Sequence, residues 1–142
     1  EQVAMQQAER LESFLGVLKR HRPDPFLLSH AVDGYSFALD FKVTDRNWPR
    51  LEALCHRMND LVLAAGGRFY LAKDSTLRPA DLANYLGPAL DKFRSFKAEM
   101  DPEGLLTSDL ADRLDVAWAA RPCHGFVKSG RTGGVGGTMR SL

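Results

Sequence analysis

The stretch YSFALDFKV, residues 35–43, alternates between apolar and polar or small residues and predicts a β-strand. Successive side chains of a strand point to opposite faces, so the two sets separate. One face requires a hydrophobic layer, whereas the other suits either solvent or a pocket. The apolar set is Tyr35, Phe37, Leu39, Phe41 and Val43, and the opposite set is Ser36, Ala38, Asp40 and Lys42.

A helix is expected directly after this strand, over residues 47–65. Its apolar residues recur at three- and four-residue spacing, and Pro49 suits the first helical turn. Gly66 and Gly67 supply the left-handed end that many helices need. Residues 68–72 are then predicted to form a short third strand.

Two interpretations are open for FLGVLKRH, residues 14–21. Residues 2–12 favour a helix by composition, and this run could continue it. It also alternates, and as a strand it would place Leu15, Val17, Lys19 and His21 on one face. Periodicity alone does not decide between them.

The second half of the chain predicts helices followed by a glycine-rich end. A helix begins near Pro79, with Ser75 or Thr76 as its cap, and divides at Gly87-Pro88. A last short helix is expected over 107–114, capped by its first threonine or serine. Residues 116–142 are rich in glycine and are predicted to form a disordered tail.

The summed pattern predicts the α+β class. The expected architecture is a small antiparallel sheet with helices on one face, followed by C-terminal helices and the tail. A chain of 142 residues with 44% hydrophobic residues is long enough for one domain with a core.

Composition excludes several classes of function. The formal net charge of +1 lacks the basic excess of a nucleic-acid-binding protein, so no nucleic-acid partner is expected. No apolar run approaches 18 residues, which argues against a membrane span. The two cysteines form no metal-binding or disulfide pattern, which favours a cytoplasmic setting. Because the chain opens on Glu1, it is expected to be part of a longer protein.

The short motifs of the chain do not by themselves indicate a phosphate-binding or metal site. GGVGG at 133–137 lacks the strand and helix that flank a phosphate-binding loop. Cys123-His124 lacks a second ligand pair, and His21, His30 and His56 are scattered, so no metal site is expected.

One set of polar residues, which lie on or beside the predicted sheet, remains as a candidate site. A lysine on a strand is usually an edge residue whose ammonium reaches solvent. The alternative is that the sheet brings these side chains to one site. The group is Lys19, Ser36, Asp40, Tyr70 and Lys73.

Four motifs in order carry a family resemblance: FLGVLKRH (14–21), GYSFALDFKV (34–43), GGRFYLAKDS (66–75) and MDPEGLLTSDLADRL (100–114). Together they resemble the C-terminal part of FAD-linked oxidoreductases of the vanillyl-alcohol-oxidase type. The likeness is strongest to the decaprenylphosphoryl-β-ribose oxidase-like group. It implies that 1–115 is a cap or substrate domain of incomplete ferredoxin-like fold, truncated before its usual first strand, and that 14–21 is a strand.

The resemblance also implies roles for individual residues. An N-terminal domain of the same polypeptide would bind FAD, with Tyr70 and Lys73 facing the flavin and Lys73 acting in catalysis. Relatives often carry an aromatic residue in place of His21, and the decaprenylphosphoryl-β-ribose oxidase group carries an asparagine and a cysteine in place of Ser36 and Ala38. The residues expected to line the substrate are Val17, Lys19, Ser36, Ala38 and Asp40.

Two functions follow from these observations. The first is a fragment of an FAD-dependent oxidoreductase that oxidises a CH–OH group of a sugar-like or polyol substrate, inactive when isolated. The second is a non-catalytic α/β module that binds a partner through its sheet.

Overall fold

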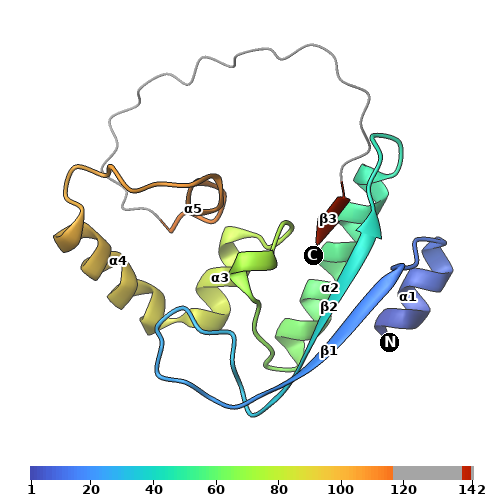
Figure 1. Cartoon of the computed structure of the whole chain (residues 1–142), viewed down its shortest axis with the longest axis horizontal. Helices are drawn as coiled ribbons and strands as arrows, with labels where there is room; N and C mark the ends of the chain where they lie inside the picture. The colour runs from blue at the N-terminus through green and yellow to red at the C-terminus, as the bar shows by residue number, and fades with distance from the viewer. Residues whose placement is uncertain (117–138, 142) are drawn as a thin grey trace.

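The computed structural model describes residues 1–116 and the backbone of residues 139–141 (Figure 1). The rest of the predicted tail lies outside the described residues. The elements, in chain order, are α1 (Gln2–Glu9), β1 (Leu15–His21), β2 (Gly34–Lys42), α2 (Trp48–Ala64), the 3₁₀ helix η1 (Leu71–Lys73), α3 (Pro79–Leu86), α4 (Pro88–Met100), α5 (Asp109–Arg113) and β3 (Met139–Ser141).

The sheet is antiparallel and has the strand order β1-β2-β3. β1 pairs with β2 along its whole length, and β3 pairs with the end of β2 on the other side. Residues 14–21 therefore contribute a strand, which decides between the two interpretations of that run. The predicted α+β class, with a small antiparallel sheet and helices on one face, is confirmed.

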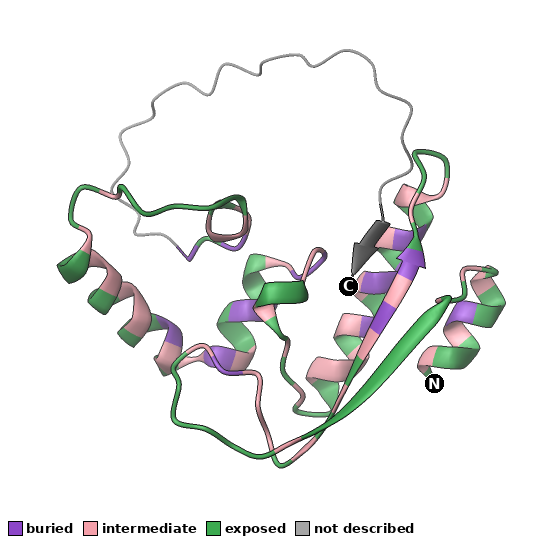
Figure 2. Ribbon diagram, viewed as in Figure 1, coloured by how far each residue is buried: buried purple, intermediate pink, exposed green. Residues whose placement is uncertain are grey.

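A first hydrophobic cluster joins the apolar face of β2 to helix α2, which runs beside the strand (Figure 1). Leu39 and Phe41 from β2 are buried against one stripe of α2, and Met5 of α1 packs at the margin. The cluster covers only one end of the strand, because Tyr35 and Phe37 remain exposed, as does most of β1 (Figure 2). The α2 stripe consists of Leu51, Leu54, Cys55 and Met58.

The turn from β2 into α2 is fixed by reciprocal hydrogen bonds. The backbone N–H of Thr44 donates to Asn47 Oδ1 at 2.8 Å, and the Asn47 N–H donates to Thr44 Oγ1 at 3.2 Å. At the other end, Gly66 has φ +71°, the left-handed conformation predicted for the residue after this helix.

The predicted strand at 68–72 is wrong. Residues 68–70 have no regular secondary structure, and η1 begins at Leu71. The apolar side chains of Phe69 and Leu71 pack against a second hydrophobic cluster formed around α3, α4 and α5. The alternating apolar residues of this stretch therefore pack against the second cluster and not against the cluster beneath the sheet. That second cluster is built from Leu77, Leu82, Leu86, Leu90, Leu114 and Val116.

The helices of the second cluster begin and end close to their predicted positions. Gly87, with φ +49°, separates α3 from α4, and Ser108 Oγ accepts a hydrogen bond from the Ala111 N–H at the start of α5. The cap of α3 was predicted at Ser75 or Thr76 but lies at Arg78, whose N–H donates to Asp81 Oδ2 at 3.2 Å. No helix in the described part of the chain combines the length and apolar character needed to cross a bilayer.

Replacing Leu54 with alanine is expected to lower the free energy of unfolding by about 2–5 kcal/mol, because it opens a cavity in the first cluster. Leu54 is fully buried. Leu106→Ala is the matched control, since Leu106 is 72% exposed, and it should change stability by less than about 0.5 kcal/mol. Urea unfolding followed by circular dichroism measures both. Equal effects would contradict the assignment of the core.

Stability should also fall in acid through Asp101, at the end of α4. A hydrogen bond from Lys97, supported by the Leu106 N–H, lowers the pKa of this carboxyl from 3.8 to about 2. A carboxyl with a lowered folded-state pKa stabilises the fold above its unfolded value, and that contribution disappears as pH falls through the folded value. Wild type should therefore lose stability between about pH 4 and pH 2.

The matched comparison for this acid effect uses Asp101→Asn and, as control, Glu103→Gln at an exposed position. The asparagine variant should lose less stability than wild type between pH 4 and pH 2 in urea titrations, whereas the control should follow wild type. Parallel curves for wild type and Asp101→Asn would refute the role of this carboxylate.

Candidate functional site

The candidate site begins on the face of the sheet opposite the first cluster. Ser36, Ala38 and Asp40 alternate along β2 with the apolar residues and are half-buried. The antiparallel register sets Lys19 opposite Ser36 and Val17 opposite Ala38. All five predicted substrate-side residues therefore lie on one face.

A chain of side-chain contacts extends this face beyond the strands. His21 ends β1, and its Nε2 lies 2.6 Å from Ser36 Oγ. The ring of His30, from the loop between β1 and β2, meets the His21 ring edge-on with 4.7 Å between centroids. The other neighbour of His30 is Tyr70, at 4.6 Å. Four side chains from four segments thus form one continuous group.

Sequence reasoning missed His30 and gave His21 no role beyond its place on the strand face. Their separation of nine residues follows no metal-ligand or helical spacing, so no pattern in the sequence joins them. The only available signal was that both lie at the ends of the segment connecting two predicted strands. The antiparallel pairing of β1 with β2 and the path of residues 22–33 bring the rings together.

The surroundings of the His30 imidazole lower its pKa. Partial burial lowers its pKa, the electrostatic influence of the neighbouring His21 and Lys19 side chains adds to this effect, and Asp24 opposes it. Asp24 in turn has a lowered pKa because its carboxylate accepts hydrogen bonds from the Ser29 hydroxyl and the Phe26 N–H. The same loop therefore carries an imidazole of lowered pKa and a carboxylate held by hydrogen bonds.

Tyr70 and Lys73 lie at the two ends of η1 instead of on a strand. Tyr70 precedes the helix and its ring is 51% exposed, with one side against His30. Lys73 is its last residue and is exposed, and its N–H donates to the Tyr70 carbonyl at 3.0 Å. The ring contact connects Tyr70 to the sheet face, whereas Lys73 is linked to it only through this short helix.

Asp74 fixes the segment that follows Lys73. Its carboxylate is almost fully buried and accepts hydrogen bonds from the Thr76 N–H at 3.1 Å and the Leu77 N–H at 2.9 Å. The Arg113 guanidinium of α5 donates to Asp74 Oδ2 at 2.6 Å and to the Leu77 carbonyl at 2.6 Å. This pair connects η1 to the second cluster and so limits where Lys73 can lie.

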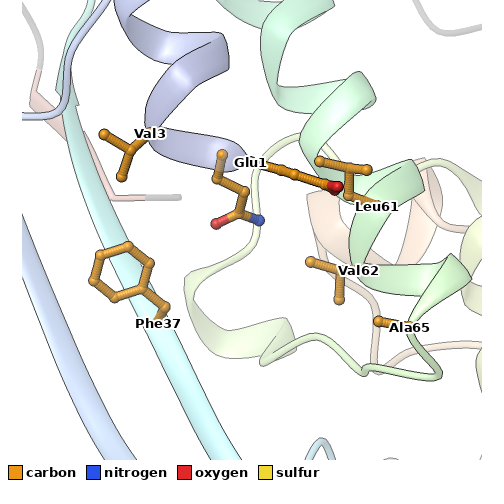
Figure 3. Close-up of a pocket in the computed structure, with 7 residues that line it drawn as sticks. Glu1, Val3, Phe37, Leu61, Val62 and Ala65 are labelled. Carbon is orange, nitrogen blue, oxygen red and sulfur yellow. The ribbon is translucent and has the colours of Figure 1, made fainter.

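A hollow on the other side of the sheet is separate from this group. It has a volume of about 490 Å³ and is mainly apolar (Figure 3). It lies beside Phe37, which is on the face opposite Ser36. The hollow therefore contains none of the predicted site residues. Its apolar lining includes Val3, Phe37, Leu61, Val62 and Ala65.

Metal chemistry has no support within the described residues. No group of three or more histidine, cysteine, aspartate or glutamate side chains in residues 1–116 could hold an ion. Burial raises the pKa of the Cys55 thiol to about 12, so this cysteine is an unreactive core residue. The glycine motif at 133–137 and Cys123-His124 lie outside the described residues.

Comparison with known proteins identifies the class to which this chain belongs. Residues 18–114 match the family described as D-arabinono-1,4-lactone oxidase, and because this match covers most of the chain, the chain belongs to that family. The expected relationship to the C-terminal part of FAD-linked oxidases is thereby confirmed.

Two relatives match most of this chain but only part of their own length. A Streptomyces coelicolor protein described as an uncharacterized protein in the mprA 5′ region is 40% identical over 102 residues, covering 71% of this chain and 27% of the relative. Decaprenylphosphoryl-β-D-ribose oxidase of Mycolicibacterium smegmatis is 31% identical over 105 residues, covering 73% of this chain and 22% of the relative. The chain thus spans about a quarter of the length of these relatives.

Replacing Asp74 with alanine is expected to destabilise the protein by about 1.5–3 kcal/mol, because charged hydrogen bonds to a buried carboxylate are lost. Asp91→Ala is the control, since Asp91 is 80% exposed and lies 3.9 Å from Arg94. Exposed pairs of this kind contribute at most about 1 kcal/mol. Thermal and urea unfolding measure the difference, and equal stability of the two variants would contradict an anchoring role for Asp74.

Proposed function

We propose that residues 1–115 are the cap or substrate domain of an FAD-dependent oxidoreductase that oxidises a CH–OH group of a sugar-like or polyol substrate. The observation that carries the proposal is the polar face of the sheet, where Lys19 and Ser36 are direct cross-strand neighbours beside the His21–His30–Tyr70 group. Membership of the lactone oxidase family supports a flavin-linked reaction.

FAD would be bound mainly by an N-terminal domain of the same polypeptide, so this chain alone is expected to be inactive. When bound, the flavin supplies the acceptor for the hydride that leaves the substrate carbon. The residues proposed to face it fit this chemistry. Tyr70 has a half-exposed ring supported from behind by His30, and Lys73 offers an exposed cation on the same short helix.

The polar face can bind hydroxyl groups in a defined orientation. Lys19 and Ser36 offer hydrogen-bond donors side by side, and Asp40 offers a carboxylate further along β2. Val17 and Ala38 form a small apolar surface between them. The Lys73 ammonium would stabilise negative charge that develops during the reaction.

The absence of a thiol at Ala38 has a chemical consequence. A cysteine on this face could form a covalent bond with an electrophilic ligand, whereas alanine cannot. The domain is therefore expected to bind its ligands without covalent attachment at this position. We also propose a cytoplasmic location, because the described cysteine, Cys55, is a free, buried thiol.

A second function is favoured by one specific observation. The described residues leave one edge of β1 unpaired, and Leu15 and Leu18 of this strand are exposed. An unpaired strand edge can accept an extended peptide, so the chain could instead serve as a partner-docking module.

A visible absorbance spectrum of the full-length polypeptide separates these functions. A bound flavin absorbs near 370 and 450 nm, and bleaching of these bands by a sugar or polyol under anaerobic conditions would support the oxidoreductase. A colourless protein that fails to bind added FAD would instead support the docking module.

Lys73→Met in the full-length flavoprotein is expected to slow flavin reduction by substrate about 10²–10³-fold, the usual effect of removing a group that stabilises developing charge. Lys92→Met, at an exposed position on α4, is the control and should react at the wild-type rate. Stopped-flow absorbance at 450 nm measures both rates, and the spectrum before mixing verifies that flavin is bound. An unchanged rate in Lys73→Met would remove this residue from the mechanism.

A further inference from the structure

The roles assigned above leave one contact of this face without a purpose, the one between His21 and Ser36. The distance of 2.6 Å between His21 Nε2 and Ser36 Oγ is that of a short hydrogen bond between an imidazole and a hydroxyl. Ser36 lies on the proposed substrate face directly opposite Lys19. A hydroxyl on that face is therefore already connected to a titratable base.

The imidazole of His21 is held from two sides. Ser36 holds Nε2, and the His30 ring meets the His21 ring at an interplanar angle of 76°. His30 is itself held against Tyr70, at an angle of 43°. This arrangement restricts rotation of the His21 side chain and keeps its Nε2 directed toward the sheet face.

The loop that carries His30 is ordered by its own hydrogen bonds. The Ser29 hydroxyl donates to Asp24 Oδ2 at 2.7 Å and accepts from the Ala31 N–H at 2.9 Å. Arg68 donates to the Ser29 carbonyl at 3.3 Å, which connects this loop to the segment leading to Tyr70. These hydrogen bonds fix the position of the loop and thereby the contact between His30 and His21.

Resting on the proposed function, we propose that His21, acting through the Ser36 hydroxyl, accepts the proton of the substrate CH–OH group. Oxidation of CH–OH to C=O removes a hydride from carbon, taken by the flavin, and a proton from oxygen, which needs a base. The substrate hydroxyl gives its proton to Ser36 Oγ while the Ser36 proton moves to His21 Nε2. The half-buried imidazolium then releases its proton to water.

The two lysines of the proposed site cannot perform this task. Lys19 and Lys73 carry protonated ammonium groups, which have no lone pair to accept a proton. The charged and titratable groups around the two imidazoles are Lys19 on β1, Asp24 in the loop and Tyr70, and Arg68 interacts with Asp24. His30, whose ring contacts both His21 and Tyr70, acts as a positioning residue.

The test uses the full-length flavoprotein and a panel of sugars and polyols, with the flavin reduction rate measured from pH 5 to pH 9. Histidine changes charge within this range, so the wild-type rate should fall toward acid pH. His21→Gln should slow reduction about 10²–10⁴-fold and remove this pH dependence, with substrate KM changed less than threefold. His30→Phe, which preserves the ring contacts, should remain within about tenfold of wild type. His56→Gln, on α2, is the control.

A second measurement does not depend on turnover. In the NMR spectrum of the 142-residue chain, Ser36→Ala should shift the side-chain nitrogen resonances of His21 while leaving those of His56 unchanged. A His21→Gln enzyme with the wild-type rate and pH profile would overturn the proposal while leaving the oxidoreductase function intact. A flavoprotein whose flavin no sugar or polyol reduces would overturn the oxidoreductase function, and this proposal with it.

Discussion

The structure depends on the packing of one half of β2 against one stripe of α2. Leu39 and Phe41 of the strand meet Leu51 and Leu54 of the helix, and all four are buried. Because side chains alternate along a strand, burial of this apolar set forces Ser36, Ala38 and Asp40 onto the other face. A shift of one residue in register would bury those polar groups instead. The hydrophobic contact thereby determines which residues are available for chemistry.

A second hydrophobic cluster positions the segment that approaches this face from outside the sheet. Phe69 and Leu71 point into the cluster around α3, α4 and α5, which leaves Tyr70 between them free to meet His30. The buried pair of Asp74 with Arg113 continues the same connection. The candidate site thus combines residues positioned by two separate small cores, which the contact between His30 and Tyr70 brings together. The first core positions the residues of the sheet face, and the second core positions Tyr70.

Much of the fold could be predicted because its signals are local. The α2 stripe, the Gly66 helix end and the division at Gly87 each follow from residue spacing or backbone preference within a few positions. Residues 68–72 show where local patterns fail. Their alternation is real, but Phe69 and Leu71 pack against helices instead of a neighbouring strand. A strand requires a partner, and a partner is a property of the whole fold.

The sequence by itself determined which face of β2 is polar and that Ser36, Ala38 and Asp40 share it, whereas the pairing of β1 with β2 brought Val17 and Lys19 to the same face. The reason is that strand periodicity is a local, steric property. Only the tertiary structure decided that His30 lies against His21 and Tyr70, and that Tyr70 reaches this face without a third strand. These contacts depend on the path of a loop and on the packing of a second core, and neither leaves a periodic signal in the chain.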